Sequence, residues 1–186
     1  MRTETITIYS YDELPETVRE TVRNNFRNIG DLWAWSGEWW NSAQKFSRIA
    51  PIDIKEADWD RAHVTCEWTG PDYALRFDHS DEIAELSGLR AWKWLLNNNW
   101  FQWARRNAAG ECTLTGYCGD CSFAGPLIEY EKNPSRVPDI KQVFYECAES
   151  WVYDAQQDCE YSYSDSAIDE MIEANDYEFL ANGDLT

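Results

Sequence analysis

Apolar residues recur at helical spacing through much of this chain. Leu14, Val18, Val22 and Phe26 lie four residues apart, which is typical of the buried face of an amphipathic helix. Gly30 follows this stripe, and glycine is a common helix stop. We therefore predict a helix that begins shortly after residue 12 and ends at Gly30.

Four further helices are predicted from the same period. The longest region contains Ser87 and Gly88, and we expect this pair to kink or split it. In the first helix, three arginines lie one turn apart on the face opposite the apolar stripe, where we expect solvent. The four further helices span 35–48, Ser80 or Asp81 to about 107, about 20 residues from Ile140, and a shorter run capped by Ser164 or Asp165; the three arginines are Arg19, Arg23 and Arg27.

Alternating apolar and polar residues predict short strands between these helices. The Thr69 to Asp72 turn contains Gly and Pro, so we expect a hairpin that pairs 62–68 with 73–77. The expected strands are 3–9, 52–54, 62–68, 73–77, two around a glycine-rich turn within 112–131, and 177–180. Together the elements predict an α+β fold in which an antiparallel sheet packs with several amphipathic helices.

The length of 186 residues fits one domain with a substantial core. We predict a single α+β domain over 1–186, with a sub-boundary at 133–138 before the C-terminal helices. Apolar residues make up 44% and aromatics 15% of the chain, which argues against disorder despite the acidity. Eight of the 11 tryptophans form two clusters, namely Trp33, Trp35, Trp39, Trp40 and Trp92, Trp94, Trp100, Trp103.

Negative charge is concentrated near the C-terminus. The formal net charge is −18, and residues 139–186 hold 13 carboxylates against one basic side chain, Lys141. Such a field favours a basic partner and opposes direct binding to nucleic acid or membranes. We expect no membrane insertion, since no stretch of about 18 apolar residues is present, and the N-terminus has no secretory pattern. Localisation in the cytoplasm follows as an expectation.

Little in the sequence indicates catalysis. The sharpest metal candidate is Cys118-x-x-Cys121 with Cys112 nearby, since two thiolates at this spacing can share a zinc ion. A second pair is missing, so we interpret the six cysteines mainly as reduced structural thiols. The two histidines, His63 and His79, have no motif partner. We expect no cofactor, no metal and no enzymatic activity; a carbohydrate-active enzyme that uses paired carboxylates is the remaining catalytic alternative.

Both ends of the chain are similar to a known family. The opening Thr5 to Leu14, followed by a charged helix, resembles small phage and prophage proteins commonly labelled "antitoxin of toxin–antitoxin stability system". Gly119-Asp120 with Phe123 and Gly125 is similar to a mid-chain turn of that family, although here the turn is shorter and flanked by cysteines. The C-terminal similarity comprises Glu160, Tyr161, Ser164, Asp165, Ala167 to Glu170, and Ile172 to Phe179. The resemblance implies a phage accessory protein and brings no catalytic residue.

The acidic helices suggest how such a protein acts. Carboxylates on successive helical turns lie roughly 5–6 Å apart, comparable to the roughly 7 Å between phosphates along one DNA strand. We interpret the chain as a phage-encoded, non-enzymatic inhibitor that occupies the basic nucleic-acid groove of a host defence protein of CRISPR or restriction type. Trp33 or Trp35 would supply an apolar anchor. The expected contact residues are Glu146, Glu149, Asp154, Asp158, Glu160, Asp165, Asp169, Glu170, Glu173 and Asp176.

Three alternatives remain open from the sequence. An antitoxin that masks a cognate toxin follows from the family label. An acidic virion or assembly protein fits the charge and the phage resemblance. The simplest alternative is an ordinary solvated helix face, which is the usual role of charged helices.

Overall fold

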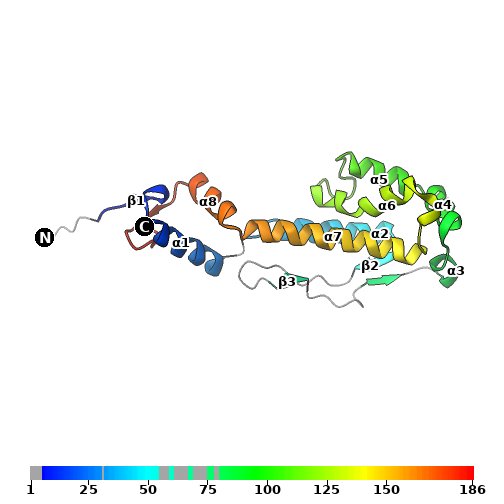
Figure 1. The fold of residues 1–186 in the computed structure, drawn as a ribbon, viewed down its shortest axis with the longest axis horizontal. Helices are drawn as coiled ribbons and strands as arrows, with labels where there is room; N and C mark the ends of the chain where they lie inside the picture. Colours follow the sequence, from blue (N-terminus) through cyan, green and yellow to red (C-terminus); the bar gives the residue numbers. More distant parts are fainter. Residues whose placement is uncertain (1–5, 31, 55–58, 61–66, 69–74, 78–79) are drawn as a thin grey trace. The chain divides into compact units, whose positions relative to one another are not determined.

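Helices make up most of the described chain (Figure 1). The structure is a computed structural model, and it describes residues 6–30, 32–54, 59–60, 67–68, 75–77 and 80–186. The helices are α1 (Glu16–Ile29), α2 (Ser36–Ile49), α3 (Asp81–Ala84), α4 (Gly88–Asn97), α5 (Trp100–Ala108), α6 (Gly125–Lys132), α7 (Ile140–Ser162) and α8 (Asp165–Ala174).

The strands within these residues are short and form two-stranded antiparallel pairs. They are β1 (Tyr9–Ser10), β2 (Ile52–Ile54), β3 (Trp59–Asp60), β4 (Glu67–Trp68), β5 (Leu75–Phe77) and β6 (Glu178–Phe179); the 3-10 turns are η1 (Tyr11–Glu13), η3 (Cys118–Phe123) and η4 (Pro134–Arg136). The fold is therefore α+β, as the sequence predicts, but it is mostly helical, and among the described residues separate two-stranded pairs stand in place of the expected antiparallel sheet.

The described residues divide into two compact units. Unit 1 combines the described parts of Met1–Ala34 with Asp158–Thr186, and unit 2 combines the described parts of Trp35–Asp60 with those of Cys66–Gln157. The segment 133–138, expected as a sub-boundary, lies within unit 2 and holds η4.

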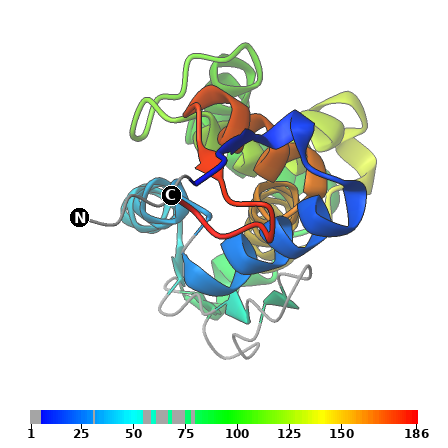
Figure 2. The ribbon, with the colours of Figure 1, turned by 90° about the vertical axis from the view of Figure 1, so that its left-hand side faces the viewer.

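Unit 1 is assembled from the two ends of the chain (Figures 1 and 2). β1 pairs with β6, with Tyr9 opposite Phe179. This pairing and the packing of α1 and α8 enclose a small apolar core. The core consists of Tyr11, Leu14, Val22, Ile168, Ile172 and Phe179. Leu14 and Val22 are half of the predicted stripe, although Leu14 follows η1 and precedes α1. Val18 and Phe26 are partly buried against the same core.

Unit 2 has a core rich in aromatic rings. Phe46 of α2 stacks on Phe123 of η3 with ring centroids 4.0 Å apart, and Phe123 stacks on Trp151 of α7 at 5.7 Å. Trp100 of α5 meets Phe144 of α7 edge to face at 4.7 Å. Buried aromatics contribute large apolar areas as well as favourable ring geometry, so much of the tryptophan excess serves packing.

The strand pairing differs from the predicted hairpin. Leu75–Phe77 pairs with Ile52–Ile54, and Glu67–Trp68 pairs with Trp59–Asp60, so 62–68 and 73–77 are not partners in the described ladders. The predicted turn at 69–72 lies outside the described residues, as do residues 3–5 of the first expected strand. Ile6 and Ile8, expected to alternate in a strand, are exposed, and the described strand there is limited to β1.

The long helix expected over 80–107 is three helices. The split near Ser87 and Gly88 is confirmed, and Gly88 takes a left-handed conformation with φ +55°. A second break at Asn99, with φ 62°, separates α4 from α5 and was not predicted. Within α4 the buried residues are Ala91 and Leu95, whereas Leu89 and Leu96 of the expected stripe are exposed.

The strands expected within 112–131 are wrong. This region forms a turn, the 3-10 helix η3 and the helix α6. Pro126 occupies the first turn of α6, where a missing N–H costs little. The glycine-rich turn itself is held by Asp120, as described below.

Candidate functional site

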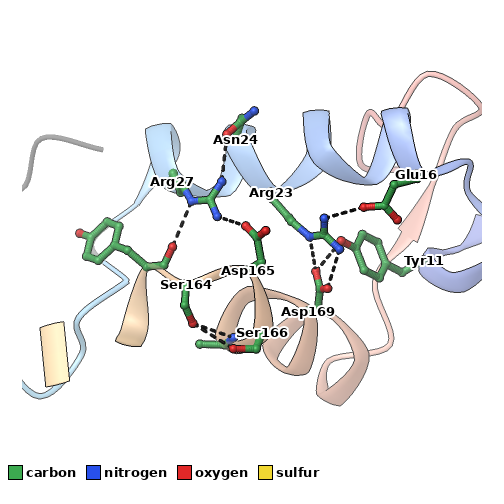
Figure 3. Close-up of polar contacts among 11 residues, drawn as sticks. Tyr11, Glu16, Arg23, Asn24, Arg27, Ser164, Asp165, Ser166 and Asp169 are labelled. Atoms are coloured by element: carbon green, nitrogen blue, oxygen red, sulfur yellow. Dashed lines mark hydrogen bonds and ion pairs between the residues drawn. The ribbon is translucent and has the colours of Figure 1, made fainter. Parts of the chain in front are cut away.

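Two arginines of α1 point at two aspartates of α8 (Figure 3). Arg23 donates from Nε to Asp169 Oδ1 at 2.8 Å and from Nη2 to Asp169 Oδ2 at 2.7 Å. The Tyr11 hydroxyl donates to Asp169 Oδ1 at 2.5 Å, and Arg23 Nη1 donates to Glu16 at 2.9 Å. The bidentate pairing of Arg23 with Asp169 is of a kind that is among the strongest side-chain interactions in proteins. Together these contacts join η1, α1 and α8.

The pKa shifts agree with this geometry. Burial acts to raise the pKa of Asp169, but hydrogen bonds from Arg23 and Tyr11 outweigh it and hold the pKa below its usual value. Its hydrogen bond to Asp169 raises the pKa of Arg23, and burial together with the same carboxylate raises the pKa of Tyr11. Asp169 is thus an ionised structural residue whose charge is already compensated.

A second ion pair lies at the N-terminus of α8. Arg27 Nη2 contacts Asp165 Oδ1, Arg27 Nε donates to the Tyr163 carbonyl at 3.0 Å, and Nη1 donates to Asn24. The Ser164 hydroxyl accepts from the Ala167 N–H and caps α8. The arginines expected to face solvent on α1 therefore hold α8 instead, and that expectation is wrong for Arg23 and Arg27.

The ten expected contact residues fall into both units. Asp158 and Glu160 of α7 lie in unit 1 with Asp165, Asp169, Glu170, Glu173 and Asp176, whereas Glu146, Glu149 and Asp154 lie in unit 2. Glu146 accepts hydrogen bonds from the Tyr130 hydroxyl and from Gln142, and Asp158 accepts from the Trp33 indole at 2.8 Å. Exposed among the ten are Glu149, Asp165, Glu170, Glu173 and Asp176.

An acidic hollow of about 520 Å³ lies where η1, the end of α8 and β6 meet in unit 1. We define it by its lining residues. Four of the eight are carboxylates, and within the described part of the chain no lysine or arginine forms an ion pair with any of the four. The lining residues are Ser10, Tyr11, Asp12, Ile172, Glu173, Asp176, Tyr177 and Glu178.

The backbone fixes the carboxylates of the acidic hollow. Asp176 adopts a left-handed conformation with φ 51°, which aspartate tolerates better than most residues, and it turns the chain from α8 into β6. Glu178 pairs with Ser10 across the β1–β6 ladder. The Ser10 hydroxyl donates to Asp12 at 2.6 Å and lowers the pKa of that carboxyl. Negative charges are therefore held around an open space.

The two candidate anchor tryptophans differ in exposure. Trp33 is fully buried, so the expectation that it meets a partner is wrong. Trp35 is 57% exposed, and its ring stacks on Tyr117 with centroids 5.9 Å apart. Of these two tryptophans, Trp35 alone keeps an exposed aromatic surface.

The described cysteines do not gather into a metal site. Cys112, Cys118, Cys121 and Cys147 are free thiols, while Cys159 is disulfide-bonded, so the expectation of reduced thiols is wrong for Cys159. Among the described residues, no group of three or more His, Cys, Asp or Glu side chains could hold a metal ion. His63 and His79 lie outside the residues that the structure describes.

One polar site was missed in the sequence. Asp120 is fully buried, and its carboxylate accepts from the backbone N–H groups of Leu114, Thr115 and Gly116 and from the Ser42 and Thr115 hydroxyls at 2.7–3.2 Å. Gly119 lies beside it, where a Cβ would meet Trp39 at 3.0 Å. The Gly-Asp pair noted in the sequence is therefore a structural clamp for the turn.

Comparison of the chain with protein-family models, curated proteins and solved structures finds no match. In the part of the chain that the structure describes, every helix is too short or too polar to cross a membrane. The physical features of the acidic hollow therefore carry the functional argument.

Proposed function

We propose that the chain is a non-enzymatic binding protein whose acidic hollow receives basic side chains of a partner protein. The observation that supports this most is the contrast within unit 1. Arg23 and Arg27 compensate Asp169 and Asp165, whereas no lysine or arginine among the described residues forms an ion pair with Glu173, Asp176 or Glu178, which surround an open space. Asp165 and Asp169 therefore stabilise the fold of unit 1, whereas Glu173, Asp176 and Glu178 are the acids that would contact a partner.

The acidic hollow suits an arginine or lysine side chain. Its walls combine carboxylates with Ile172 and Tyr177, and long cationic side chains bind such places through an apolar stem and a charged head. Arginine is favoured, because its planar guanidinium can bridge two carboxylates. A net charge of −18 adds attraction at longer range.

The biological role that we propose is inhibition of a basic nucleic-acid-handling protein of a bacterial host, of CRISPR or restriction type. The chain would compete with nucleic acid for the basic groove, and the phage-family resemblance of the two ends supports this setting. Asp165 and Asp169 are left out of the proposed contact surface, since their charge holds α8 to α1.

Two variants with equal net charge test the binding mode. The first carries Glu173→Gln, Asp176→Asn and Glu178→Gln in the acidic hollow. The control carries Glu20→Gln, Glu82→Gln and Glu85→Gln, which are exposed acids outside it. We expect the first variant to bind a nona-arginine peptide at least about tenfold more weakly by calorimetry, the loss of roughly one good charged contact. The control should stay within about twofold. Equal losses would mean that only net charge matters, and the acidic hollow would not be the site.

The same variants test the role. Purified chain is titrated into DNA-cleavage reactions of host restriction and CRISPR nucleases, with product measured on gels. We expect inhibition by the natural chain and by the control, but not by the variant of the acidic hollow. Peptide binding without inhibition of any host nuclease would reject the inhibitor role and leave the binding mode intact. Growth rescue from an adjacent toxin gene would then favour the antitoxin.

A further inference from the structure

Two free thiols lie close together at the ends of one turn in unit 2. The Sγ atoms of Cys112 and Cys121 are 3.6 Å apart, and both residues are partly exposed. Cys118 belongs to the same turn but is exposed, and only the Cys112–Cys121 pair has its sulfurs within contact distance among the described thiols.

The protein holds both ends of this turn in place. Thr113, next to Cys112, donates its N–H to Asn107 Oδ1 at 2.9 Å, and its hydroxyl accepts from Asn107 Nδ2 at 2.9 Å. Asp120, next to Cys121, is buried and accepts five hydrogen bonds, as described above. Fixing the neighbours of two thiols raises their effective concentration toward each other.

We infer that Cys112 and Cys121 form a redox-active dithiol that closes to an intramolecular disulfide. A disulfide has an S–S distance of about 2.05 Å, so the sulfurs must approach by roughly 1.5 Å, which is within the reach of side-chain rotation at a turn. Cys112 adopts a left-handed conformation with φ 46°, an uncommon backbone for a residue with a side chain.

The chemistry balances with a hydroperoxide as the oxidant. The thiolate of one cysteine attacks the peroxide oxygen, forms a sulfenic acid and releases water or an alcohol. The second thiol then attacks the sulfenic sulfur, the S–S bond forms, and hydroxide leaves and is protonated to water. In total two thiols lose two protons and two electrons, and the peroxide is reduced.

The environment sets the rate of this reaction. Burial, and then the hydrogen bond with Cys112, raise the pKa of Cys121 to about 11, so Cys121 is largely a neutral thiol near pH 7. Because the thiolate is the nucleophile, attack by Cys121 on the peroxide should be slow at neutral pH and faster in alkaline solution. This is a responsive pair and not a catalytic oxidoreductase.

Closure would fix the ten-residue turn that carries Tyr117. Trp35 stacks on Tyr117, and Trp39 meets the same ring edge to face at 5.7 Å. The disulfide would therefore stiffen the base of the exposed Trp35 surface. This consequence is independent of the acidic hollow, which belongs to unit 1.

The test uses the full chain, reduced, freed of reductant and treated with hydrogen peroxide. Remaining thiols are blocked with N-ethylmaleimide, and the chain is digested with chymotrypsin and Asp-N, because trypsin leaves Cys112, Cys118 and Cys121 on one peptide, 107–132. The peptides are then mapped by mass spectrometry. We expect a linkage of Cys112 to Cys121, loss of N-ethylmaleimide labelling at these two cysteines, and its return after dithiothreitol. Cys118→Ser should leave the linkage intact, whereas Cys112→Ser should abolish it.

Two results would overturn the inference. One is that peroxide oxidises Cys118 while Cys112 and Cys121 still react fully with N-ethylmaleimide. The other is that Cys118→Ser forms no disulfide with peroxide while Cys112→Ser still forms one, which would mean that Cys118 and not Cys112 is a partner in the disulfide. Differential labelling of the unmutated chain gives the answer even if a variant fails to fold.

Discussion

The ion pair between α1 and α8 gives the sharpest test of how unit 1 is held together. Asp169→Asn keeps the size of the side chain but removes its charge and replaces an acceptor with a donor that faces Arg23 Nη2. The Arg23 side chain is 11% exposed and that of Asp169 is 27% exposed, so water replaces the lost contact poorly. Hydrogen bonds to charged groups are each worth about 1.5–3 kcal/mol.

We expect Asp169→Asn to lower the free energy of unfolding by about 2–3 kcal/mol. Asp165→Asn is the matched control, because it lies on the same helix and also pairs with an arginine, but its side chain is 64% exposed. Exposed pairs contribute at most about 1 kcal/mol. For a chain of this length, the first variant should lower Tm by roughly 4–12 °C.

Thermal unfolding by circular dichroism measures the overall loss, and hydrogen exchange read by mass spectrometry locates it. Faster exchange should be confined to α1, α8 and the β1–β6 pair. If Asp165→Asn costs as much as Asp169→Asn, burial does not determine the strength of these pairs, and the prediction fails. It also fails if Asp169→Asn leaves exchange in α8 unchanged.

Three further predictions follow from the same structure. Because the pKa of Asp169 is lowered in the folded chain, the ionised carboxylate stabilises unit 1 at pH values above the ordinary pKa of 3.8, and this stabilisation is lost as pH falls through the lower folded pKa. In urea titrations below pH 4, the free energy of unfolding should depend less on pH for Asp169→Asn than for the unmodified chain; parallel curves would contradict this. Gly119→Ala should cost about 1–3 kcal/mol in urea unfolding because its Cβ meets Trp39 and Tyr117, whereas Gly37→Ala, with open space around it, should gain up to about 1 kcal/mol. Asp120→Ala should cost more than about 3 kcal/mol by the same measurement, because several buried donors lose their acceptor; a loss below 1 kcal/mol would refute the clamp.

The helical period gave the outline of the fold. α1, α2, α7 and α8 fall close to their expected ranges, and Ser164 caps α8 as expected, because each combines an apolar stripe with local start or stop signals. The final strand is also confirmed in part, since a strand was expected over 177–180 and β6 covers Glu178–Phe179, where it pairs with β1.

The errors arise where tertiary contacts outweigh local pattern. The region 112–131 alternates like strands, but the buried Asp120 carboxylate organises its backbone into a turn. Arg23 and Arg27 have the spacing of a solvated face, yet α8 brings aspartates to them from more than a hundred residues away. A sequence pattern records which side chains share a face but not what that face meets.

The candidate site shows the same limit. Charge counting identified the acidic C-terminal segment, and Glu173 and Asp176 do line the acidic hollow. Asp12 and Glu178 were missed because they come from η1 and β6, and only the β1–β6 ladder brings these elements together. Charge counting also could not distinguish Asp169, whose charge is compensated by Arg23, from the carboxylates that line the acidic hollow.

Because unit 1 combines elements from distant parts of the chain, its helix α1 is synthesised long before its partner α8. α1 ends at residue 29 and α8 begins at residue 165, so α1 emerges about 136 residues before its partner. At roughly 5–20 residues per second, that wait is roughly 7–27 s. During that time the nascent α1 segment lacks its ion pairs with α8 and the apolar residues of α8 that bury it. A chaperone that shields it, or a ribosome that stalls early, would therefore decide how much of the newly made protein matures.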